Sequence, residues 1–145
     1  MLYFDTSFLV PLILPESTSD KVAHFFRGLP AAELAVSHWT RVEFSSLIAR
    51  EVRMGGLEAG AATQAAARFE AMLEESFGVL LPSTADFELA KQYLGNFRTG
   101  LRAGDALHLA IAKNNRAETV YSLDRILLSA GRALGLPVSI GVAPR

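Results

Sequence analysis

Residues 2–7, Leu-Tyr-Phe-Asp-Thr-Ser, set out a pattern that recurs along the chain. The apolar run from Leu2 to Phe4 has the length of a short strand and ends at an acidic residue, Asp5. Ser7 follows at a position suited to capping a short helix. A strand that is apolar at every position is typical of a parallel sheet, because helices cover both faces of such a sheet.

Four more apolar runs of strand length follow, and segments with helical periodicity separate them. We predict strands at 34–37, 79–81, 119–122 and 138–140, and helices at 15–26, 40–52, 57–77, 87–97, 103–113 and 125–134. Short strands that alternate with helices indicate a sheet between two helical layers. The predicted fold is therefore α/β: a three-layer α/β/α domain with a central, mainly parallel sheet of about five short strands.

The composition favours one ordered domain over residues 1–145. With 50% hydrophobic and 20% charged residues, the chain does not have the composition of a disordered protein. It contains no cysteine, which excludes disulfides, thiolate metal sites and cysteine nucleophiles and favours a cytoplasmic location. The apolar run 8–14 is too short to span a membrane, and no basic segment precedes it as in a signal peptide.

Four acidic residues fall at or near the ends of predicted strands or in the first turns of predicted helices. Asp5 ends the first strand and Asp124 lies just beyond the strand 119–122, whereas Glu43 and Asp105 lie in first helical turns. Ligands of parallel α/β sheets bind at the carboxyl ends of the strands, so we expect these side chains to meet in one cleft.

Each of these residues also has a structural explanation. Thr40 and Glu43 have the spacing of a capping box, and Asp124 can cap the helix that follows it. Asp105 can favour the positive end of a helix dipole, and Asp5 can cap the turn after it. Only the joint occurrence of all four favours a shared site.

A cluster of carboxylates predicts a particular chemistry. The negative charges repel one another unless cations neutralise them, and oxygen ligands without a Cys or His cluster select Mg²⁺ or Mn²⁺. Such a metal site polarises a phosphodiester, activates water and stabilises the leaving oxygen. Hydrolysis of a phosphodiester is the reaction that these residues predict.

Four segments in a fixed order resemble a known family. They are Tyr-Phe-Asp-Thr-Ser at 3–7, Arg-Val-Glu at 41–43 with Arg50 following, Leu-Arg-Ala-Gly-Asp-Ala-Leu-His-Leu-Ala at 101–110, and Tyr-Ser-Leu-Asp at 121–124. Together they are similar to the successive motifs of PIN-domain ribonucleases. Their order, spacing and total length are most similar to the VapC-type toxin of a toxin–antitoxin pair.

The resemblance implies a function, a metal and partners. It implies that the chain is an endoribonuclease toxin that cleaves RNA with Mg²⁺ or Mn²⁺. It also implies a homodimer and a VapB-like antitoxin that places a helix or an extended tail in a groove. The metal-binding and catalytic residues implied are Asp5, Glu43, Asp105 and Asp124.

Three hydroxyl side chains are expected to support the site. Thr6 and Ser7 can donate hydrogen bonds to Asp5 or to water, although we expect Ser7 to act mainly as a helix cap. Ser122 stands where the family usually has Thr and keeps the hydroxyl group, which can orient Asp124 or a water.

Two further residues lie beside these motifs. Gly104 occupies a position where the family often has Pro or another small residue, and we expect it only to loosen the start of the helix. His108 shares a helix face with Asp105, but the preference of hard cations for oxygen favours a packing or hydrogen-bonding role over metal ligation.

Other functional classes fit the motifs less well. A signalling receiver needs a pair of acids after the first strand, and an Asp-x-Asp phosphatase needs a second acid at the position of Ser7. A catalytically silent PIN scaffold that only binds a protein partner or RNA remains the alternative.

The charge balance is compatible with RNA. The chain has 14 basic and 15 acidic residues, so its net charge is −1. If four acids bind metal, 11 acids remain against 14 bases, and the rest of the protein is mildly basic. Several arginines near the motifs can pair with phosphate or with the carboxylates, and the sequence does not select among them: Arg41, Arg50, Arg98, Arg102 and Arg125.

Overall fold

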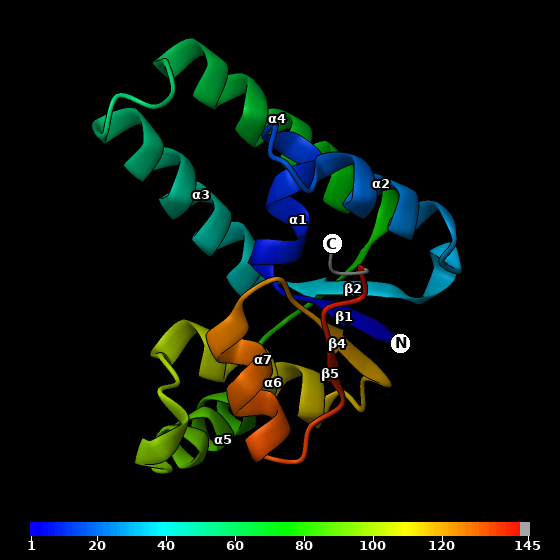
Figure 1. Ribbon diagram of the computed structural model, residues 1–145, viewed down its shortest axis with the longest axis vertical. Helices are drawn as coiled ribbons and strands as arrows, with labels where there is room; N and C mark the ends of the chain where they lie inside the picture. The colour runs from blue at the N-terminus through cyan, green and yellow to red at the C-terminus, as the bar shows by residue number, and fades with distance from the viewer. Residues whose placement is uncertain (143–145) are drawn as a thin grey trace.

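The computed structural model describes residues 1–142, and its centre is a parallel five-stranded sheet (Figure 1). The strand order is β3-β2-β1-β4-β5, and every neighbouring pair is parallel. The predicted α/β class and parallel sheet are confirmed. The strands are β1 (Leu2–Phe4), β2 (Leu34–Ser37), β3 (Gly78–Leu80), β4 (Thr119–Tyr121) and β5 (Val138–Ser139).

Helices form a layer on each face of the sheet (Figure 1). One layer holds α1 (Thr6–Ile13), α2 (Ser19–Arg27), α3 (His38–Arg53) and α4 (Ala59–Ser76). The other holds α5 (Thr84–Leu94), α6 (Ala103–Asn114) and α7 (Arg125–Ala133), and the short turns η1 (Ala31–Glu33) and η2 (Phe97–Thr99) complete the described elements. None of the helices in residues 1–142 has the length and apolar character needed to cross a lipid bilayer.

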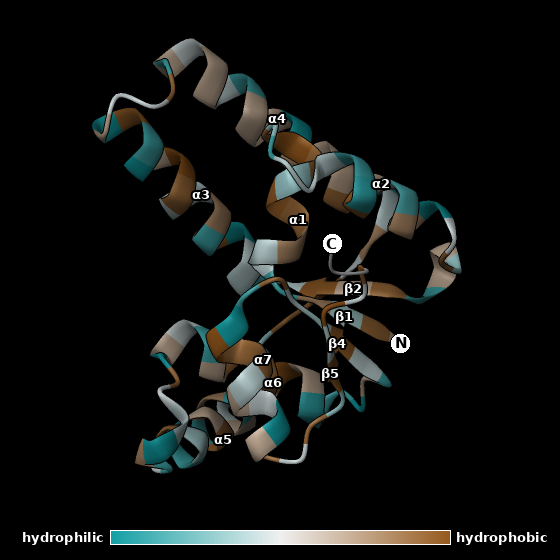
Figure 2. Cartoon of the chain, in the orientation of Figure 1, coloured by the Kyte–Doolittle hydropathy of each residue, from teal (hydrophilic) through white to brown (hydrophobic). Residues whose placement is uncertain are grey.

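Successive side chains of β1 point alternately into the two hydrophobic cores. Leu2 and Phe4 point into the core under α1–α4, whereas Tyr3 points into the core under α5–α7. Successive side chains of a strand face opposite sides, so a strand covered on both faces has to be apolar throughout. Hydrophobic residues accordingly concentrate on β1, β2 and α1 (Figure 2).

The long helices α3 and α4 pack against each other beyond the sheet (Figure 1). The rings of Phe44 and Phe69 stack with centroids 3.9 Å apart and an interplanar angle of 7°. Nε of Arg41 donates to both carboxylate oxygens of Glu70, at 3.0 and 3.1 Å. One apolar and one charged contact therefore join the two helices.

The opposite layer is organised around α6. Every residue from Ala106 to Ala112 is buried, because α5, α7 and the sheet enclose this helix. Asn114 donates to the buried carboxylate of Asp86 at 2.8 Å, and Asp86 accepts from the backbone N–H of Ser83 at the start of α5. These bonds join α5 to α6 and hold the helix that carries Asp105.

Several predicted helix boundaries are wrong: the helix predicted over 15–26 begins at Ser19, and the helix predicted from 87 begins at Thr84. The helix predicted from Thr40 begins at His38, with Ser37 as its N-cap, and Thr40 accepts a hydrogen bond from the Ser37 N–H at 3.4 Å. Phe97 was assigned to the apolar stripe of the preceding helix, but α5 ends at Leu94 and the Phe97 side chain in η2 is 92% exposed.

Close packing of α7 against β5 predicts that Gly131→Ala destabilises the fold. A Cβ at this position would lie 2.4 Å from Cγ1 of Val138, a branched side chain with little freedom to move. We expect a loss of about 1–3 kcal/mol in the free energy of unfolding, measured by urea denaturation. Gly60→Ala is the control, since no described atom other than those of its own helix backbone and chain neighbours lies within 4 Å of its Cβ position, and it should stabilise by up to about 1 kcal/mol.

A double-mutant cycle isolates the contact. Val138→Ala should cost less in the Gly131→Ala background than in the wild type, because it removes the clash. Equal costs in the two backgrounds would contradict this explanation.

Candidate active site

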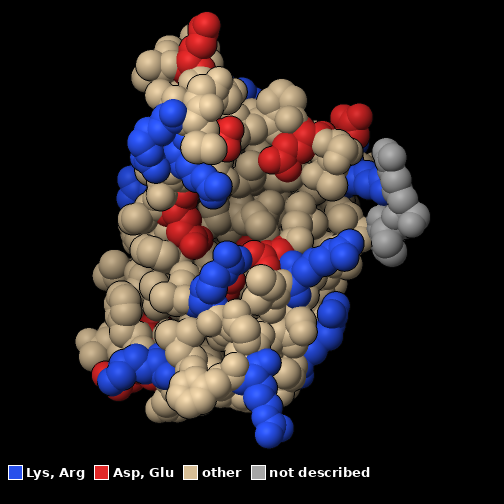
Figure 3. Space-filling view, turned by 60° about the vertical axis from the view of Figure 1, so that its left-hand side comes forward, with Lys and Arg blue, Asp and Glu red and all other residues tan. Residues whose placement is uncertain are grey.

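A cavity of about 480 Å³ lies where β1, β2 and β4 end, and all four predicted acidic residues line it. They come from the segments that directly follow these strands and from the first turn of α6. Figure 3 shows acidic side chains in the hollow of this face and basic side chains around it. Arg50 and Arg102 also line the cavity. The sheet topology therefore brings together residues that lie far apart in the sequence.

Asp5 is the most buried of these acids, with 3% of its surface exposed. One carboxylate oxygen accepts hydrogen bonds from the Ser7 hydroxyl at 2.7 Å and from the Phe8 N–H at 3.2 Å. The other accepts from the Ser122 hydroxyl at 2.7 Å. Burial raises the pKa of Asp5, and the positive charge of His108 and these hydrogen bonds act against that rise.

Ser7 is not the helix cap that the sequence suggested. Asp5 is the N-cap of α1, and Ser7 lies inside the helix. The Ser7 hydroxyl instead accepts from the Leu123 N–H at 3.0 Å, and the Ser122 hydroxyl accepts from the Asp124 N–H at 2.9 Å. Both hydroxyls therefore connect the end of β1 to the segment after β4.

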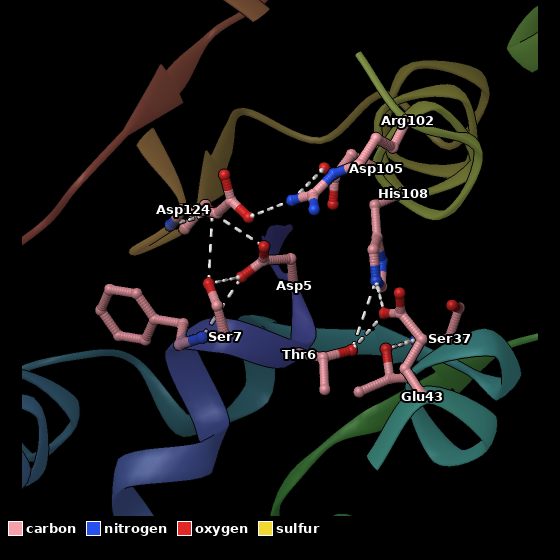
Figure 4. A network of polar contacts seen from close by, with 12 residues as sticks. Asp5, Thr6, Ser7, Ser37, Glu43, Arg102, Asp105, His108 and Asp124 are labelled. Carbon is pink, nitrogen blue, oxygen red and sulfur yellow. Dashed lines mark hydrogen bonds and ion pairs between the residues drawn. The ribbon is translucent and has the colours of Figure 1, made fainter. Parts of the chain in front are cut away.

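Glu43 is held by two donors from other elements. The Thr6 hydroxyl donates to Glu43 Oε1 at 2.5 Å, and Nε2 of His108 pairs with the same oxygen (Figure 4). The predicted capping box of Thr40 and Glu43 does not form, because α3 begins two residues before Thr40 and the Glu43 carboxylate faces the cavity. Thr6 supports Glu43 rather than Asp5.

His108 carries the charge that balances Glu43. It is 1% exposed, and its Nδ1 lies 2.7 Å from the Tyr3 hydroxyl, which donates to Ser37 at 3.0 Å. The Tyr3 hydroxyl already donates its hydrogen bond to Ser37, so it can accept one from the N–H at Nδ1 of His108. With Nε2 donating to Glu43, both ring nitrogens then carry protons. Burial alone lowers the pKa of His108, but the hydrogen bond and charge of Glu43, with Asp5 and Asp105, outweigh it and raise the pKa.

Burial also acts on Glu43. Desolvation raises its pKa, but the hydrogen bond and charge of His108 and the hydrogen bond of Thr6 lower the pKa below its usual value. Glu43 and His108 thus form an ion pair inside the wall of the cavity. The sequence predicted a hydrogen-bonding histidine, but its partner across 65 residues was not foreseen.

Asp105 and Asp124 are less well compensated. One oxygen of Asp124 caps α7 by accepting from the N–H groups of Ile126 and Leu127, at 2.8 and 3.1 Å, so its structural explanation also holds. The other faces Nη2 of Arg102 at 3.4 Å. Oδ2 of Asp105 is buried and makes no hydrogen bond to any described residue. Burial, followed by the charges of Asp124 and Asp5, raises the pKa of Asp105 to about 6.

Gly104 permits the close approach of α6 to Glu43. A Cβ here would lie 2.7 Å from Oε2 of Glu43 and 3.4 Å from the Trp39 ring. The expectation that Gly104 only loosens the start of the helix is therefore wrong. The small residue leaves room for the Glu43 carboxylate in its observed position, and Oε2 would have to move if a Cβ were added.

The acids share the cavity without forming a closed cage. Within residues 1–142, no three His, Asp or Glu side chains lie close enough together to hold one metal ion among them. Glu43 is turned toward His108 and Thr6, and Asp5 toward two serines. Oδ2 of Asp105 has no hydrogen bond from a described residue, and Oδ2 of Asp124 faces only the exposed Arg102 at 3.4 Å.

Comparison with known proteins identifies the family. The PIN domain family matches residues 2–133, which is most of the chain. The chain belongs to the PIN domain family. The predicted family resemblance is thereby confirmed, and the three-layer arrangement of this PIN domain agrees with it. Among curated protein sequences, none matches this chain.

Several solved structures share the fold of this PIN domain. Mycobacterium tuberculosis VapC20 is 20% identical with a TM-score of 0.73, and the alignment covers 99% of this chain and 100% of that one. FitAcB from Neisseria gonorrhoeae is 20% identical with a TM-score of 0.70, with 95% and 96% covered. VapBC-1 from nontypeable Haemophilus influenzae is 16% identical with a TM-score of 0.66, with 96% and 97% covered.

The raised pKa of Asp105 predicts that the metal-free protein loses stability as pH rises. A folded pKa of about 6 lies above the unfolded value of 3.8, so protonated Asp105 favours the folded state. This contribution is complete below about pH 4 and is lost as pH rises through about 6. We expect it to lower the free energy of unfolding by about 1–2 kcal/mol between pH 5 and 7.5.

Urea denaturation in EDTA measures this change, and Asp105→Asn should flatten the pH dependence. His108 contributes in the same direction, so only the difference between the wild type and Asp105→Asn reports on Asp105. An equally steep pH dependence in both proteins would show that Asp105 ionises normally in the fold.

Proposed function

We propose that this PIN domain is a metal-dependent endoribonuclease that acts as the toxin of a toxin–antitoxin pair. The observation that carries the proposal is the convergence of Asp5, Glu43, Asp105 and Asp124 on one cavity at the carboxyl edge of the sheet. Membership of the PIN family supports a nuclease. The catalytic and metal-binding roles of these four residues, and the supporting roles of Thr6, Ser7 and Ser122, are part of the proposal.

The donor set suits Mg²⁺ or Mn²⁺. The cavity offers carboxylate oxygens, one of them buried without a hydrogen bond, and a raised pKa at Asp105 indicates uncompensated negative charge. Mg²⁺ often takes only one or two protein carboxylates and completes its shell with water and phosphate oxygens. Asp105 and Asp124 would hold such an ion most directly, with Asp5 and Glu43 behind them.

The chain's own residues prepare the site for hydrolysis. A bound divalent cation would supply charge to stabilise the phosphate oxygens and would make water more acidic. Ser7 and Ser122 hold both oxygens of Asp5 in place, and the Glu43–His108 pair fixes the second acid. Positioned acceptors of this kind can orient a water molecule toward a phosphodiester and take its proton.

RNA and a protein antitoxin are the proposed partners. VapC20 is a Sarcin-Ricin loop cleaving toxin, which supports RNA as the substrate class. VapBC2 from Rickettsia felis was solved bound to a DNA fragment from its promoter, and FitAB bound to a DNA fragment. These structures support a VapB-like antitoxin as partner, and we further propose a homodimer. The absence of cysteine supports a cytoplasmic location.

A catalytically silent PIN scaffold is the second candidate. It is favoured by one observation, that no three acidic or histidine side chains in the described part of the chain converge on one point. Calorimetric titration with Mn²⁺ separates the two functions. The scaffold would show no heat of binding that depends on Asp5 and Asp105, whereas the nuclease should bind Mn²⁺ and lose that binding in the variants.

Replacement of the central acids should abolish cleavage without unfolding the protein. Asp5→Asn and Asp105→Asn should each slow the cleavage of a labelled RNA by about 100-fold or more, because each removes a charge from the site. EDTA should have the same effect, and added Mg²⁺ or Mn²⁺ should reverse it. Asp20→Asn, at an exposed position in α2, is the control and should cleave normally.

Circular dichroism is needed to show that each variant is folded. Undiminished cleavage by Asp5→Asn or Asp105→Asn in EDTA, from preparations free of other nucleases, would refute the proposed function.

Gly104→Ala should reduce activity while the fold remains stable. The added Cβ would displace Oε2 of Glu43, whereas alanine favours the helix relative to glycine by about 1 kcal/mol. We expect RNA cleavage to fall by about tenfold or more, with a free energy of unfolding equal to or above that of the wild type. Gly60→Ala, in an open helical position, should retain full activity.

A further inference from the structure

Arg102 is placed unlike any other basic residue of the cavity. It is the N-cap residue of α6, and its guanidinium reaches across the cavity toward Asp124 (Figure 4). Nη2 lies 3.4 Å from Oδ2 of Asp124 and 3.8 Å from Oδ2 of Asp105. Arg50 lines the same cavity but makes no ion pair with a described residue.

The contacts of Arg102 are loose. Charge-assisted hydrogen bonds between arginine and carboxylate are usually about 2.7–2.9 Å long and often use two nitrogens, whereas here one nitrogen serves both acids at longer distances. The Arg102 side chain is 67% exposed, so water screens both pairs. Arg102 therefore lies over Asp105 and Asp124 but neutralises their negative charge only in part.

The unmet charge lies at Oδ2 of Asp105, which Arg102 approaches only to 3.8 Å. Oδ2 of Asp105 is buried and accepts no hydrogen bond from any described residue. The Asp105 side chain is only 14% exposed, so a small cation seated between the acids would be less screened than the guanidinium at the rim. A divalent ion would also carry twice the charge, and it would repel Arg102 from this position.

We propose that Arg102 exchanges partners during function: it pairs with Asp105 and Asp124 in the metal-free protein and binds an RNA phosphate once a divalent cation occupies these acids. This inference rests on the proposed nuclease function and assigns a substrate-binding residue to it. A released guanidinium at the exposed rim has five N–H donors and, among residues 1–142, no other acid within ion-pair distance. A phosphate of RNA bound in the cavity supplies the missing acceptor.

The exchange predicts opposite effects of one variant on two ligands. Arg102→Gln should bind Mn²⁺ about two- to fivefold more tightly than the wild type by calorimetry, because a competing cation is removed. The same variant should bind RNA more weakly when Mn²⁺ is present. Arg98→Gln removes one positive charge from an exposed position on η2 outside the cavity and is the matched control.

RNA binding is measured with a short labelled single-stranded RNA of mixed sequence by rapid mixing, at times before cleavage, so that all four acids stay in place. In saturating Mn²⁺, Arg102→Gln should weaken binding several-fold and reduce the slope of log affinity against log salt by about 0.7. In EDTA it should change the affinity little, because Arg102 is then paired with the acids. Arg98→Gln should have the same small effect in both conditions.

Three results would overturn the exchange. Unchanged Mn²⁺ affinity in Arg102→Gln, with a wild type that binds Mn²⁺ and cleaves RNA, would refute the exchange and leave the nuclease function intact. An equal loss of RNA affinity with Mn²⁺ and with EDTA would make Arg102 a permanent phosphate contact. A wild type that neither binds Mn²⁺ nor cleaves RNA would refute the exchange and the proposed function together.

Discussion

The burial of the Asp5 carboxylate is the constraint on which the arrangement of the site depends. A charged group with only 3% of its surface exposed is costly unless its oxygens are hydrogen-bonded or neutralised. Ser7 and Phe8 supply bonds from α1, and Ser122 supplies one from the segment after β4. The bonds that stabilise Asp5 therefore also set the start of α1 and the end of β4 relative to β1.

Charge compensation divides the four acids into two pairs. Asp5 and Glu43 are satisfied by the protein itself, through serine hydroxyls and through His108. Asp105 and Asp124 share one positively charged partner, the loosely bound Arg102. Asp124 also caps α7 through its other oxygen, whereas one oxygen of Asp105 has no hydrogen-bond partner among the described residues. The protein thus compensates the charge on one side of the cavity internally, whereas on the other side only Arg102 offsets it. This asymmetry supports the proposed metal site in a way that a count of acidic residues does not.

Features that depend on the local sequence were predicted more accurately than features that depend on competing or distant contacts. Strands were predicted to within a residue or two, because runs such as Leu2–Phe4 are buried on both faces and have to be apolar. Helix starts were less accurate, because neighbouring polar residues compete to cap a helix: Asp5 rather than Ser7 caps α1. Phe97 matched a helical stripe but lies beyond the end of α5, where no core is available to bury it.

The sequence by itself determined the alternation of strands and helices, the parallel sheet and the four acids that such a sheet brings to one edge, because these depend on local periodicity and on general rules of topology. Only the tertiary structure decided how the acids are held. The bonds from Thr6 to Glu43, from His108 to Glu43 and from Ser122 to Asp5 join residues 37, 65 and 117 positions apart. Such partners depend on strand register and on how closely α6 approaches α3 at Gly104, and a linear pattern contains no measure of that distance.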